Sequence, residues 1–235
     1  MLWVIEISKI FEKKTENTNK TEKIYKNVRI ILRLHAKQDK IYCIQENNRG
    51  YIMEKIYETA YAKINLGLDV LGKRSDGYHE VRMVMQSVGL SDAVEIEEGE
   101  GLVVETDHSG LAGGPDNLAW KAAELLARCC GKIPNVHIRL NKKIFLAAGL
   151  AGGSSDAAAV MRGLSRLWQL DLTAPELEKL AAELGSDIPF CITGGTALAE
   201  GRGEILTELP EAPELLLVLA KPKLEVATGW VYGNF

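Results

Sequence analysis

The sequence predicts an α+β fold in which an antiparallel sheet begins the domain and amphipathic helices pack on it. Residues 64–70 alternate apolar with polar or small side chains, which is the period of a strand that buries one face. Residues 155–169 place apolar side chains at helical spacing, so one stripe of a helix can face the sheet. The presence of both periods favours strands and helices within one domain.

Two more helices are predicted from the residues at their ends. Asp116 is a candidate N-cap for a helix that runs to about Cys130. Thr173 and Glu176 have the spacing of a capping box, and the helix that they begin should end at Gly185. We expect both helices to pack on the sheet.

Turn signals separate the remaining strands. Residues 73–78 contain Ser-Asp-Gly, and Gly201-Arg202-Gly203 has the composition of a hairpin turn. Strands are expected at residues 80–88, 93–97, 102–106, 136–140, 215–220 and in the segment that runs from the Gly194-Gly195 pair to Leu198.

Composition changes abruptly near Met53. Residues 1–52 carry 11 basic and 6 acidic residues, which gives them a net charge of +5, whereas the remainder of the chain has a net charge of −9. Segments 24–34 and 40–45 alternate enough to form short strands, whereas residues 12–23 are almost wholly polar and are predicted to be disordered. We interpret this part as an atypical extension, upstream of a natural start at Met53. A basic docking arm is the alternative.

Two domains are predicted beyond the extension. Residues 53–209 form the principal domain, and Pro210 and Pro213 mark a border before residues 210–235, the start of a second domain. A net charge of −4 and a pI near 5.7 disfavour nucleic acid and anionic lipid as partners. The sequence lacks a membrane-spanning apolar run, a secretory signal and a zinc-like cysteine spacing, so a cytoplasmic monomer or weak homodimer is expected.

A loop rich in glycine and small residues runs directly into the helix at 155–169. Gly149, Gly152 and Gly153 permit unusual backbone torsions and a close approach of a ligand to the amides. The helix N-terminus favours an anion, and Ser154 or Ser155 can act as cap, phosphate donor or metal contact. The segment has neither the Gly-Lys-Ser/Thr ending of a Walker loop nor the Gly-x-Gly-x-x-Gly order. It predicts a phosphate site, with a tight turn before a packing helix as the alternative.

Four motifs occur together in the order of one enzyme family. They are Ala62-Lys63-Ile64-Asn65-Leu66, Asp76-Gly77-Tyr78-His79, Gly149-Leu150-Ala151-Gly152-Gly153-Ser154-Ser155 and Gly185-Ser186-Asp187-Ile188-Pro189. On these motifs, residues 56–235 resemble the 4-diphosphocytidyl-2-C-methyl-D-erythritol kinases. That family belongs to the small-molecule kinases related to galactokinase, homoserine kinase, mevalonate kinase and phosphomevalonate kinase.

The resemblance implies both a fold and a reaction. The implied fold is a kinase domain of the ribosomal-protein-S5-domain-2-like type, followed by a ferredoxin-like domain that is incomplete here. The implied reaction transfers the γ-phosphoryl group of ATP to the 2-hydroxyl of a cytidine-diphosphate-linked methylerythritol, in the non-mevalonate synthesis of isoprenoid and terpenoid precursors. Mg²⁺ is expected with ATP, although no acidic cluster in the sequence identifies its ligands.

The family's two catalytic positions fall on Lys63 and Asp187. Asp187 can accept the proton of the substrate hydroxyl, and Lys63 can orient the pair and stabilise the developing negative charge. Asn65, two residues along the same face of the strand, can hydrogen-bond the substrate hydroxyl. Taken alone, these residues would be ordinary strand and turn residues.

The resemblance also assigns the nucleotide and cytidine sites. The residues that it implies for binding the cytidine end of the substrate are Tyr78, His79, Thr228 and Tyr232. The nucleotide loop comprises Phe145, Leu146, Ala147, Ala148, Gly149, Leu150, Ala151, Gly152, Gly153, Ser154 and Ser155.

Two features depart from the family pattern. Phe145 stands where the family commonly has proline, and the chain has no late glycine-rich motif. The alternative functions are a sister kinase acting on homoserine or mevalonate and a non-catalytic nucleotide-binding fragment.

Overall fold

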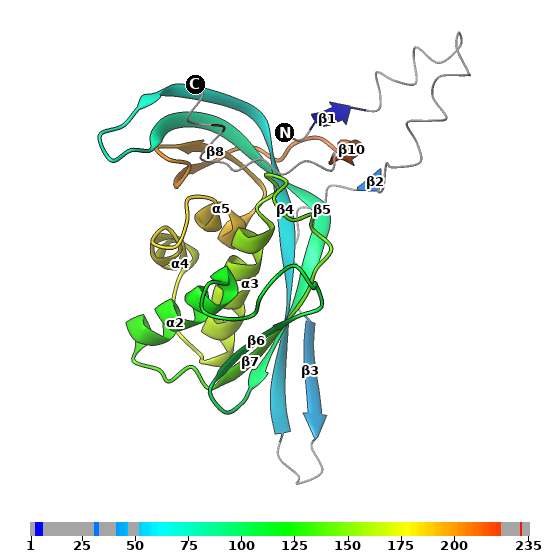
Figure 1. Cartoon of the computed structure of the whole chain (residues 1–235), viewed down its shortest axis with the longest axis vertical. Helices are drawn as coiled ribbons and strands as arrows, with labels where there is room; N and C mark the ends of the chain where they lie inside the picture. The colour runs from blue at the N-terminus through cyan, green and yellow to red at the C-terminus, as the bar shows by residue number, and fades with distance from the viewer. Residues whose placement is uncertain (1–2, 7–30, 33–40, 47–51, 222–230, 232–235) are drawn as a thin grey trace, which may run out of the picture.

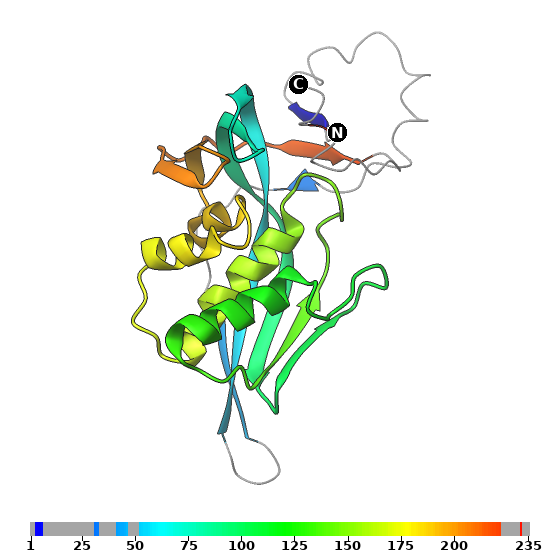
Figure 2. The same ribbon diagram turned by 60° about the vertical axis from the view of Figure 1, so that its left-hand side comes forward.

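A computed structural model describes residues 3–6, 31–32, 41–46, 52–221 and 231. Within these residues, a seven-stranded sheet forms one layer and the helices lie together against one of its faces (Figures 1 and 2). The strands of this sheet are β3 (Ile41–Glu46), β4 (Ile52–Lys73), β5 (His79–Glu98), β6 (Leu102–Thr106), β7 (Val136–Asn141), β8 (Thr196–Glu200) and β9 (Ile205–Glu208). The helices are α2 (Leu118–Cys130), α3 (Gly152–Leu167), α4 (Ala174–Ala181) and α5 (Ile188–Thr193).

The long hairpin of β4 and β5 organises the sheet. The strand order is β3-β4-β5-β7-β6, and β8 pairs with the first part of β5 and with β9. Only the β6–β7 pair is parallel among the strand pairs described. Beyond the helices, β4 and β5 continue as an arm that curves above α5 (Figure 1). Separately, β10 (Leu217–Ala220) lies between β1 (Trp3–Glu6) and β2 (Ile31–Leu32) in a small antiparallel sheet.

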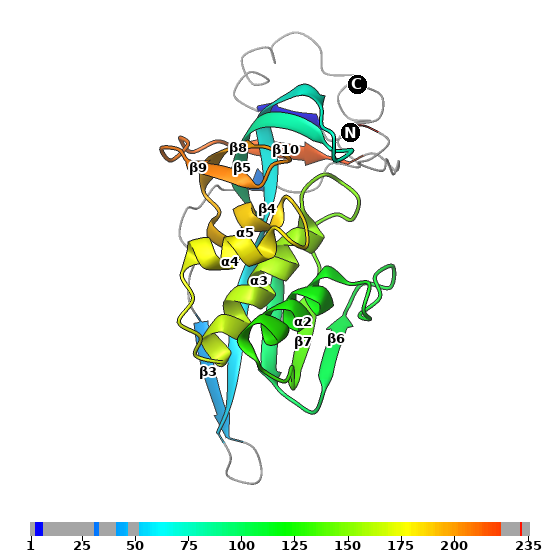
Figure 3. The ribbon, with the colours of Figure 1, turned by 90° about the vertical axis from the view of Figure 1, so that its left-hand side faces the viewer.

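The main core lies between the helices and the sheet (Figure 3). Its members on α3 are small or aliphatic, including Ala158, Met161 and Leu164, and each is fully buried. This confirms the predicted apolar stripe of that helix. A second, smaller cluster joins β4 and β5 to β10 and to both ends of the glycine loop; it contains Ala62, Ile64, Val88, Leu90, Ile144, Leu150, Leu217 and Leu219.

Several predicted strands are confirmed, but two that were predicted separately form a single strand. The expected strands at 80–88 and 93–97 are joined within β5, because the extended backbone continues through residues 89–92 and the β4–β5 register shifts there. Within residues 64–70, the predicted burial is confirmed for Ile64, partly for Val70, which packs against the main core, and is wrong for Leu66 and Leu68. Leu66 and Leu68 are 45% and 38% exposed, because they lie on the arm beyond the helix layer.

The predicted helices exist with shifted ends. Asn117, rather than Asp116, caps α2, and its side-chain oxygen accepts from the backbone N–H of Ala119 at 2.9 Å. The capping box of Thr173 and Glu176 is confirmed. Helix α5 was not predicted, because its six residues are too few to establish a helical period.

The short strands expected near 24–34 and 40–45 correspond to β2 and β3. Residues 12–23, Thr228 and Tyr232 lie outside the described residues. None of the helices in the described part of the chain is long and apolar enough to cross a membrane.

Candidate functional site

Lys63 faces the helix layer because of a bulge in the β4–β5 pair. Up to Ala60, even-numbered residues of β4 contribute to the main core, but the register shifts between Tyr61 and Lys63. Such an irregularity re-aims the following side chains. The Lys63 side chain is consequently only 5% exposed, and its ammonium group lies beside α5.

Asn65 and Asp187 are the polar partners of this ammonium group. Lys63 Nζ donates to Asn65 Oδ1 at 3.2 Å, which confirms that the two side chains share one face of the strand. Lys63 Nζ also lies 3.5 Å from Asp187 Oδ1. Two neighbouring site residues of β4 therefore meet a third, Asp187, that lies more than 120 positions later in the sequence.

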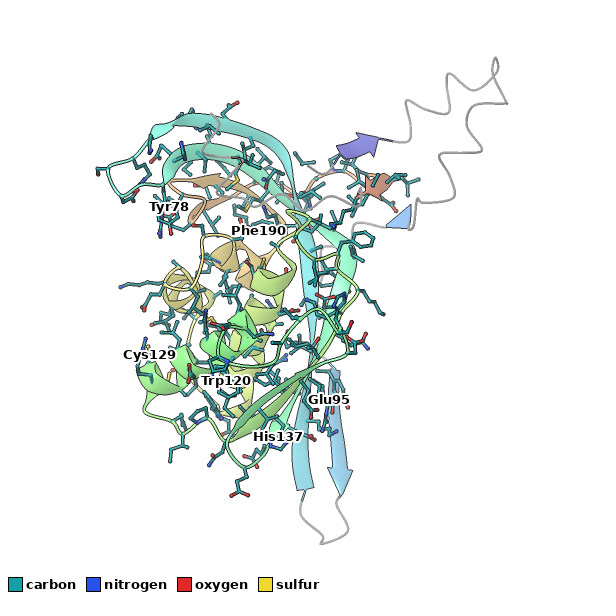
Figure 4. The ribbon with its side chains drawn as sticks, viewed as in Figure 1. Tyr78, Glu95, Trp120, Cys129, His137 and Phe190 are labelled. Carbon is teal, nitrogen blue, oxygen red and sulfur yellow. The ribbon has the colours of Figure 1, made fainter. Side chains whose placement is uncertain are left out.

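Asp187 is held at the N-terminus of α5 by the residues that follow it. Pro189 stands in the first turn of the helix, where its lack of an N–H costs nothing. Ile188 and Phe190 are buried in the main core and anchor the helix (Figure 4). The Asp187 side chain makes no capping bond and is 35% exposed. Its carboxylate can thus pair with Lys63 and still reach a bound molecule.

The glycine loop starts and ends at buried anchors. Ile144 before it and Leu150 near its end are 3% and 1% exposed. The carbonyl oxygen of Leu150 accepts from the backbone N–H of Lys63 at 3.1 Å. The loop is thereby attached to β4 at the lysine that pairs with Asp187.

The backbone of the loop differs from the expectation. Gly149 has a positive φ of 72°, as predicted for a glycine, but two non-glycine residues also do: Ala147 at 50° and Ala151 at 57°. Gly152 and Gly153 are already helical, because α3 begins three residues earlier than expected. At Gly152 a side chain would meet Ile144 Cγ2 at 3.0 Å, so close packing is what this glycine permits.

The two serines of the loop have different surroundings. Ser154 is half-buried in the first turn of α3, without a side-chain capping bond at the helix start. Ser155 is 1% exposed, and its hydroxyl donates to the carbonyl oxygen of Tyr61 at 2.6 Å. The structure therefore argues against Ser155 as a phosphate or metal contact, because its hydroxyl is occupied on the β4 side. Phe145, at the proline position, packs against the second cluster.

A buried ionic cluster that the sequence analysis missed connects both ends of the loop. Lys142 Nζ contacts one carboxylate oxygen each of Asp92 and Asp156, and these three side chains are at most 2% exposed. The other oxygen of Asp92 accepts from the backbone N–H of Ile144 at 2.8 Å. Burial, which is the largest effect, raises the pKa of Asp156 to about 7. The only sequence signal was that Lys142 and Asp156 flank an apolar and small-residue loop, because Asp92 lies 50 residues before Lys142 in the chain.

Tyr78 and His79 lie at the far end of the arm. His79 pairs with Lys73, ten residues along β4 from Lys63. Tyr78 is 54% exposed, and the guanidinium carbon of Arg202 lies 5.0 Å from its ring centroid (Figure 4). The structure does not bring Tyr78 into contact with the Lys63–Asp187 pair, and its predicted companions Thr228 and Tyr232 lie outside the described residues.

A cavity of about 750 Å³ lies elsewhere, along β5, β6 and β7 and the segment 107–113. None of the predicted site residues lines it, and its charged lining includes Glu95, Glu105 and Asp107. Arg139 also lines it but is paired with Glu95 and Glu105, so the excess of acidic groups disfavours a polyphosphate, and the loop and the Lys63–Asp187 pair remain the candidate site. The described residues contain no group of three or more His, Cys, Asp or Glu that could hold a metal ion.

Residues 117–195, which include the glycine loop and Asp187, match the family described as GHMP kinases N terminal domain. Two curated relatives named 4-diphosphocytidyl-2-C-methyl-D-erythritol kinase are similar over three quarters of the chain. The Acetivibrio thermocellus protein is 50% identical over 183 residues, covering 77% of this chain and 65% of the relative. The Synechococcus protein is 53% identical over 178 residues, covering 75% of this chain and 58% of the relative. The chain thus spans less than two thirds of the length of either relative.

Solved structures show the same fold. A crystal structure of 4-(cytidine 5'-diphospho)-2C-methyl-D-erythritol kinase is 36% identical with a TM-score of 0.62, covering 76% of this chain and 63% of that one. Mevalonate kinase from Methanococcus jannaschii is 14% identical with a TM-score of 0.51, covering 66% and 56%, and shares the fold alone. These similarities confirm a mixed α/β fold of the GHMP kinase N-terminal type.

Proposed function

We propose that the chain is a kinase of the GHMP family and that it transfers the γ-phosphoryl group of ATP to the 2-hydroxyl of 4-diphosphocytidyl-2-C-methyl-D-erythritol. One observation carries this proposal: a buried lysine whose backbone N–H is bonded to the end of the glycine loop lies 3.5 Å from a partly exposed carboxylate. Identity of 50% over 77% of the chain to a kinase of this name supports the choice of substrate.

The proposed chemistry needs one proton acceptor and one cation. Asp187 accepts the proton of the substrate hydroxyl. As this proton leaves, the hydroxyl oxygen of the substrate bonds to the γ-phosphorus of ATP, and the bond between that phosphorus and the departing ADP oxygen breaks. Lys63 holds the carboxylate in place and stabilises negative charge on the reacting oxygens. Asn65 accepts from Lys63 and leaves its amide N–H₂ able to donate to the substrate.

The glycine loop suits the phosphate groups of ATP. Gly149 has a positive φ, and no atom lies within 4 Å of the position that a side chain would occupy there. The exposed backbone next to the N-terminus of α3 offers N–H donors and the positive end of the helix dipole. Mg²⁺ would supply further charge neutralisation, held largely by phosphate oxygens and water, because the described residues offer no acidic cluster.

The cytidine end of the substrate would lie at the arm. Tyr78 is exposed and can stack on a base, and His79 can hydrogen-bond its polar edge. We include Thr228 and Tyr232 in this proposed site on sequence grounds alone.

The direct test is to incubate the 235-residue chain with ATP, Mg²⁺ and 4-diphosphocytidyl-2-C-methyl-D-erythritol and to measure the phosphorylated product by mass spectrometry. Asp187→Asn keeps the shape of the side chain and should lower kcat at least about 10²-fold, because it removes the proton acceptor. Homoserine and mevalonate serve as competing substrates. Turnover of either in preference to the cytidine compound would refute the substrate assignment, and stabilisation by ATP without turnover would favour a nucleotide-binding fragment.

A further inference from the structure

One side chain of α3 joins β4 to α5. Arg162 Nη1 donates to the carbonyl oxygen of Cys191 at 2.6 Å and to that of Ile192 at 3.3 Å, in the last turn of α5. Arg162 Nη2 donates to the carbonyl oxygen of Thr59 on β4 at 3.0 Å. A single guanidinium group therefore bonds the backbones of two elements that are far apart in sequence.

The contacts of Arg162 with α5 and with β4 both lie a few residues along the chain from the proposed catalytic pair, Lys63 and Asp187. The N–H of Cys191 donates to the carbonyl oxygen of Asp187 at 3.3 Å, so Arg162 holds the residue that closes the turn beginning at Asp187. On the other side, Thr59 precedes Lys63 by four residues of continuous strand. A shift of α5 relative to β4 would change the separation of Lys63 from Asp187 directly.

Ser155, two helical turns before Arg162, makes a parallel connection on the same face of α3. Its hydroxyl donates to the carbonyl oxygen of Tyr61 at 2.6 Å and lies 3.4 Å from Cys191 Sγ. Burial raises the pKa of the Cys191 thiol to about 12, so the group at this contact is the neutral thiol. Helix α3 is thus joined at two levels to both elements that carry the pair.

Arginine is suited to this position by its geometry. Its planar guanidinium presents five N–H donors in fixed directions, which a lysine ammonium cannot reproduce. A cation also suits the carbonyl end of a helix, and a six-residue helix such as α5 has little stability of its own. The charge of Arg162, whose side chain is 12% exposed, is balanced by Glu58 at 3.1 Å from Nε.

We propose that Arg162 is a positioning residue that fixes the separation of Lys63 from Asp187 by holding α5 against β4. This inference rests on the proposed kinase function for its catalytic consequence. The hydrogen bonds of Arg162 go to the backbones of β4 and α5 and to Glu58, so we infer that it acts through the two backbones.

The first test is Arg162→Lys, which keeps the charge and most of the apolar stem but cannot bond all three carbonyl oxygens. We expect kcat to fall about 10- to 100-fold, because a displacement of about 1 Å at reacting groups has an effect of that order. KM for ATP and for the cytidine substrate should change less than about 3-fold, since the glycine loop and the arm are untouched. Arg162→Met, which removes every donor, should be the more impaired variant.

The matched control is Glu58→Gln, which removes the ion pairs of Glu58 with Arg162 and with Arg166 but leaves the carbonyl bonds of Arg162. Its kcat should remain within about 3-fold of the wild-type value. Amide hydrogen exchange supplies a readout that needs no turnover: exchange at Cys191 and Gly194 should accelerate in Arg162→Lys and stay near wild type in Glu58→Gln. Thermal melts of each variant give the folded fraction by which kcat is corrected.

Three results would overturn the positioning role: an unchanged kcat in Arg162→Lys, an equal loss of kcat in Glu58→Gln, or equal exchange of α5 in Arg162→Lys and wild type. A wild-type chain that phosphorylates none of the substrates would refute the proposed function instead. Exchange at Cys191 and Gly194 would still decide whether Arg162 holds α5.

Discussion

Asp156→Asn should abolish a pH dependence of stability that arises in the ionic cluster beneath the glycine loop. In that cluster two carboxylates, Asp92 and Asp156, share the ammonium group of Lys142. Asp156 Oδ1 has no hydrogen-bond partner among the described residues. Burial raises the pKa of Asp156 from 3.8 to about 7, so this carboxyl group holds its proton more tightly in the folded chain than in the unfolded chain.

The sign of the effect follows from the number of bound protons. Between the unfolded pKa of 3.8 and the folded pKa of about 7, the folded chain binds more protons than the unfolded chain. The free energy of unfolding should therefore fall as the pH rises, with a slope of up to about 1.4 kcal/mol per pH unit. This contribution is complete below about pH 4 and lost above pH 7, which amounts to about 4 kcal/mol across the window.

The assay is urea unfolding of wild type and Asp156→Asn at half-unit steps from pH 4.5 to 8.5. The difference in unfolding free energy, wild type minus variant, should decrease through this range and level off above pH 7. Glu95→Gln is the control of opposite sign, because a hydrogen bond from Lys55 is the largest cause that lowers the pKa of Glu95. Its contribution is present above the unfolded pKa of 4.5 and is lost on acidification below it, so the titrations of this control are extended below pH 4.5. A wild-type minus Asp156→Asn difference that is flat or rises with pH would refute the reasoning.

Three further substitutions test single contacts. Thr173→Ala removes the capping box with Glu176 and should lower the free energy of unfolding by about 1 kcal/mol in urea titrations, whereas an unchanged midpoint would contradict a capping role. Gly163→Ala places a Cβ 2.5 Å from Ile96 Cδ1 in the core and should cost about 1–3 kcal/mol in the same assay; a neutral result would mean that the core yields there. Tyr78→Ala should raise KM for the cytidine substrate about 10-fold with KM for ATP unchanged, and steady-state kinetics in which both constants change would exclude a specific stacking role.

The sequence allowed much of the sheet, including the strand that carries Lys63, to be predicted, because strands depend on local alternation. Lys63 and Asn65 were expected on one face of a strand, and their side chains are hydrogen-bonded. The burial of Lys63 could not be predicted, because it depends on a register shift between β4 and β5 that has no signature within either strand. The exposure of Leu66 likewise depends on where the helix layer ends.

The candidate site likewise has features that the local sequence predicts and features that depend on tertiary structure. Its members were recognised as four motifs in order, but their meeting point depends on α5, which is too short to show a helical period. The glycine loop was expected to run directly into a helix, and it runs into α3, but of its three glycines Gly149 alone has a positive φ, which Ala147 and Ala151 share. Such torsions are imposed by the buried anchors at either end of the loop, which is a tertiary effect.

Helix α3 explains why a loop and a distant ion pair are parts of one site. Its first turn terminates the glycine loop, Asp156 joins it to Lys142 at the other end of that loop, and Arg162 joins it to β4 and α5. Asp156 and Arg162 are six residues apart, about 9 Å along a helix axis. Because packed helices move as rigid units, the position of the loop relative to the Lys63–Asp187 pair is determined by one element. The proposed kinase reaction requires that same relation, since a phosphoryl group held at the loop would have to meet a hydroxyl held at the pair.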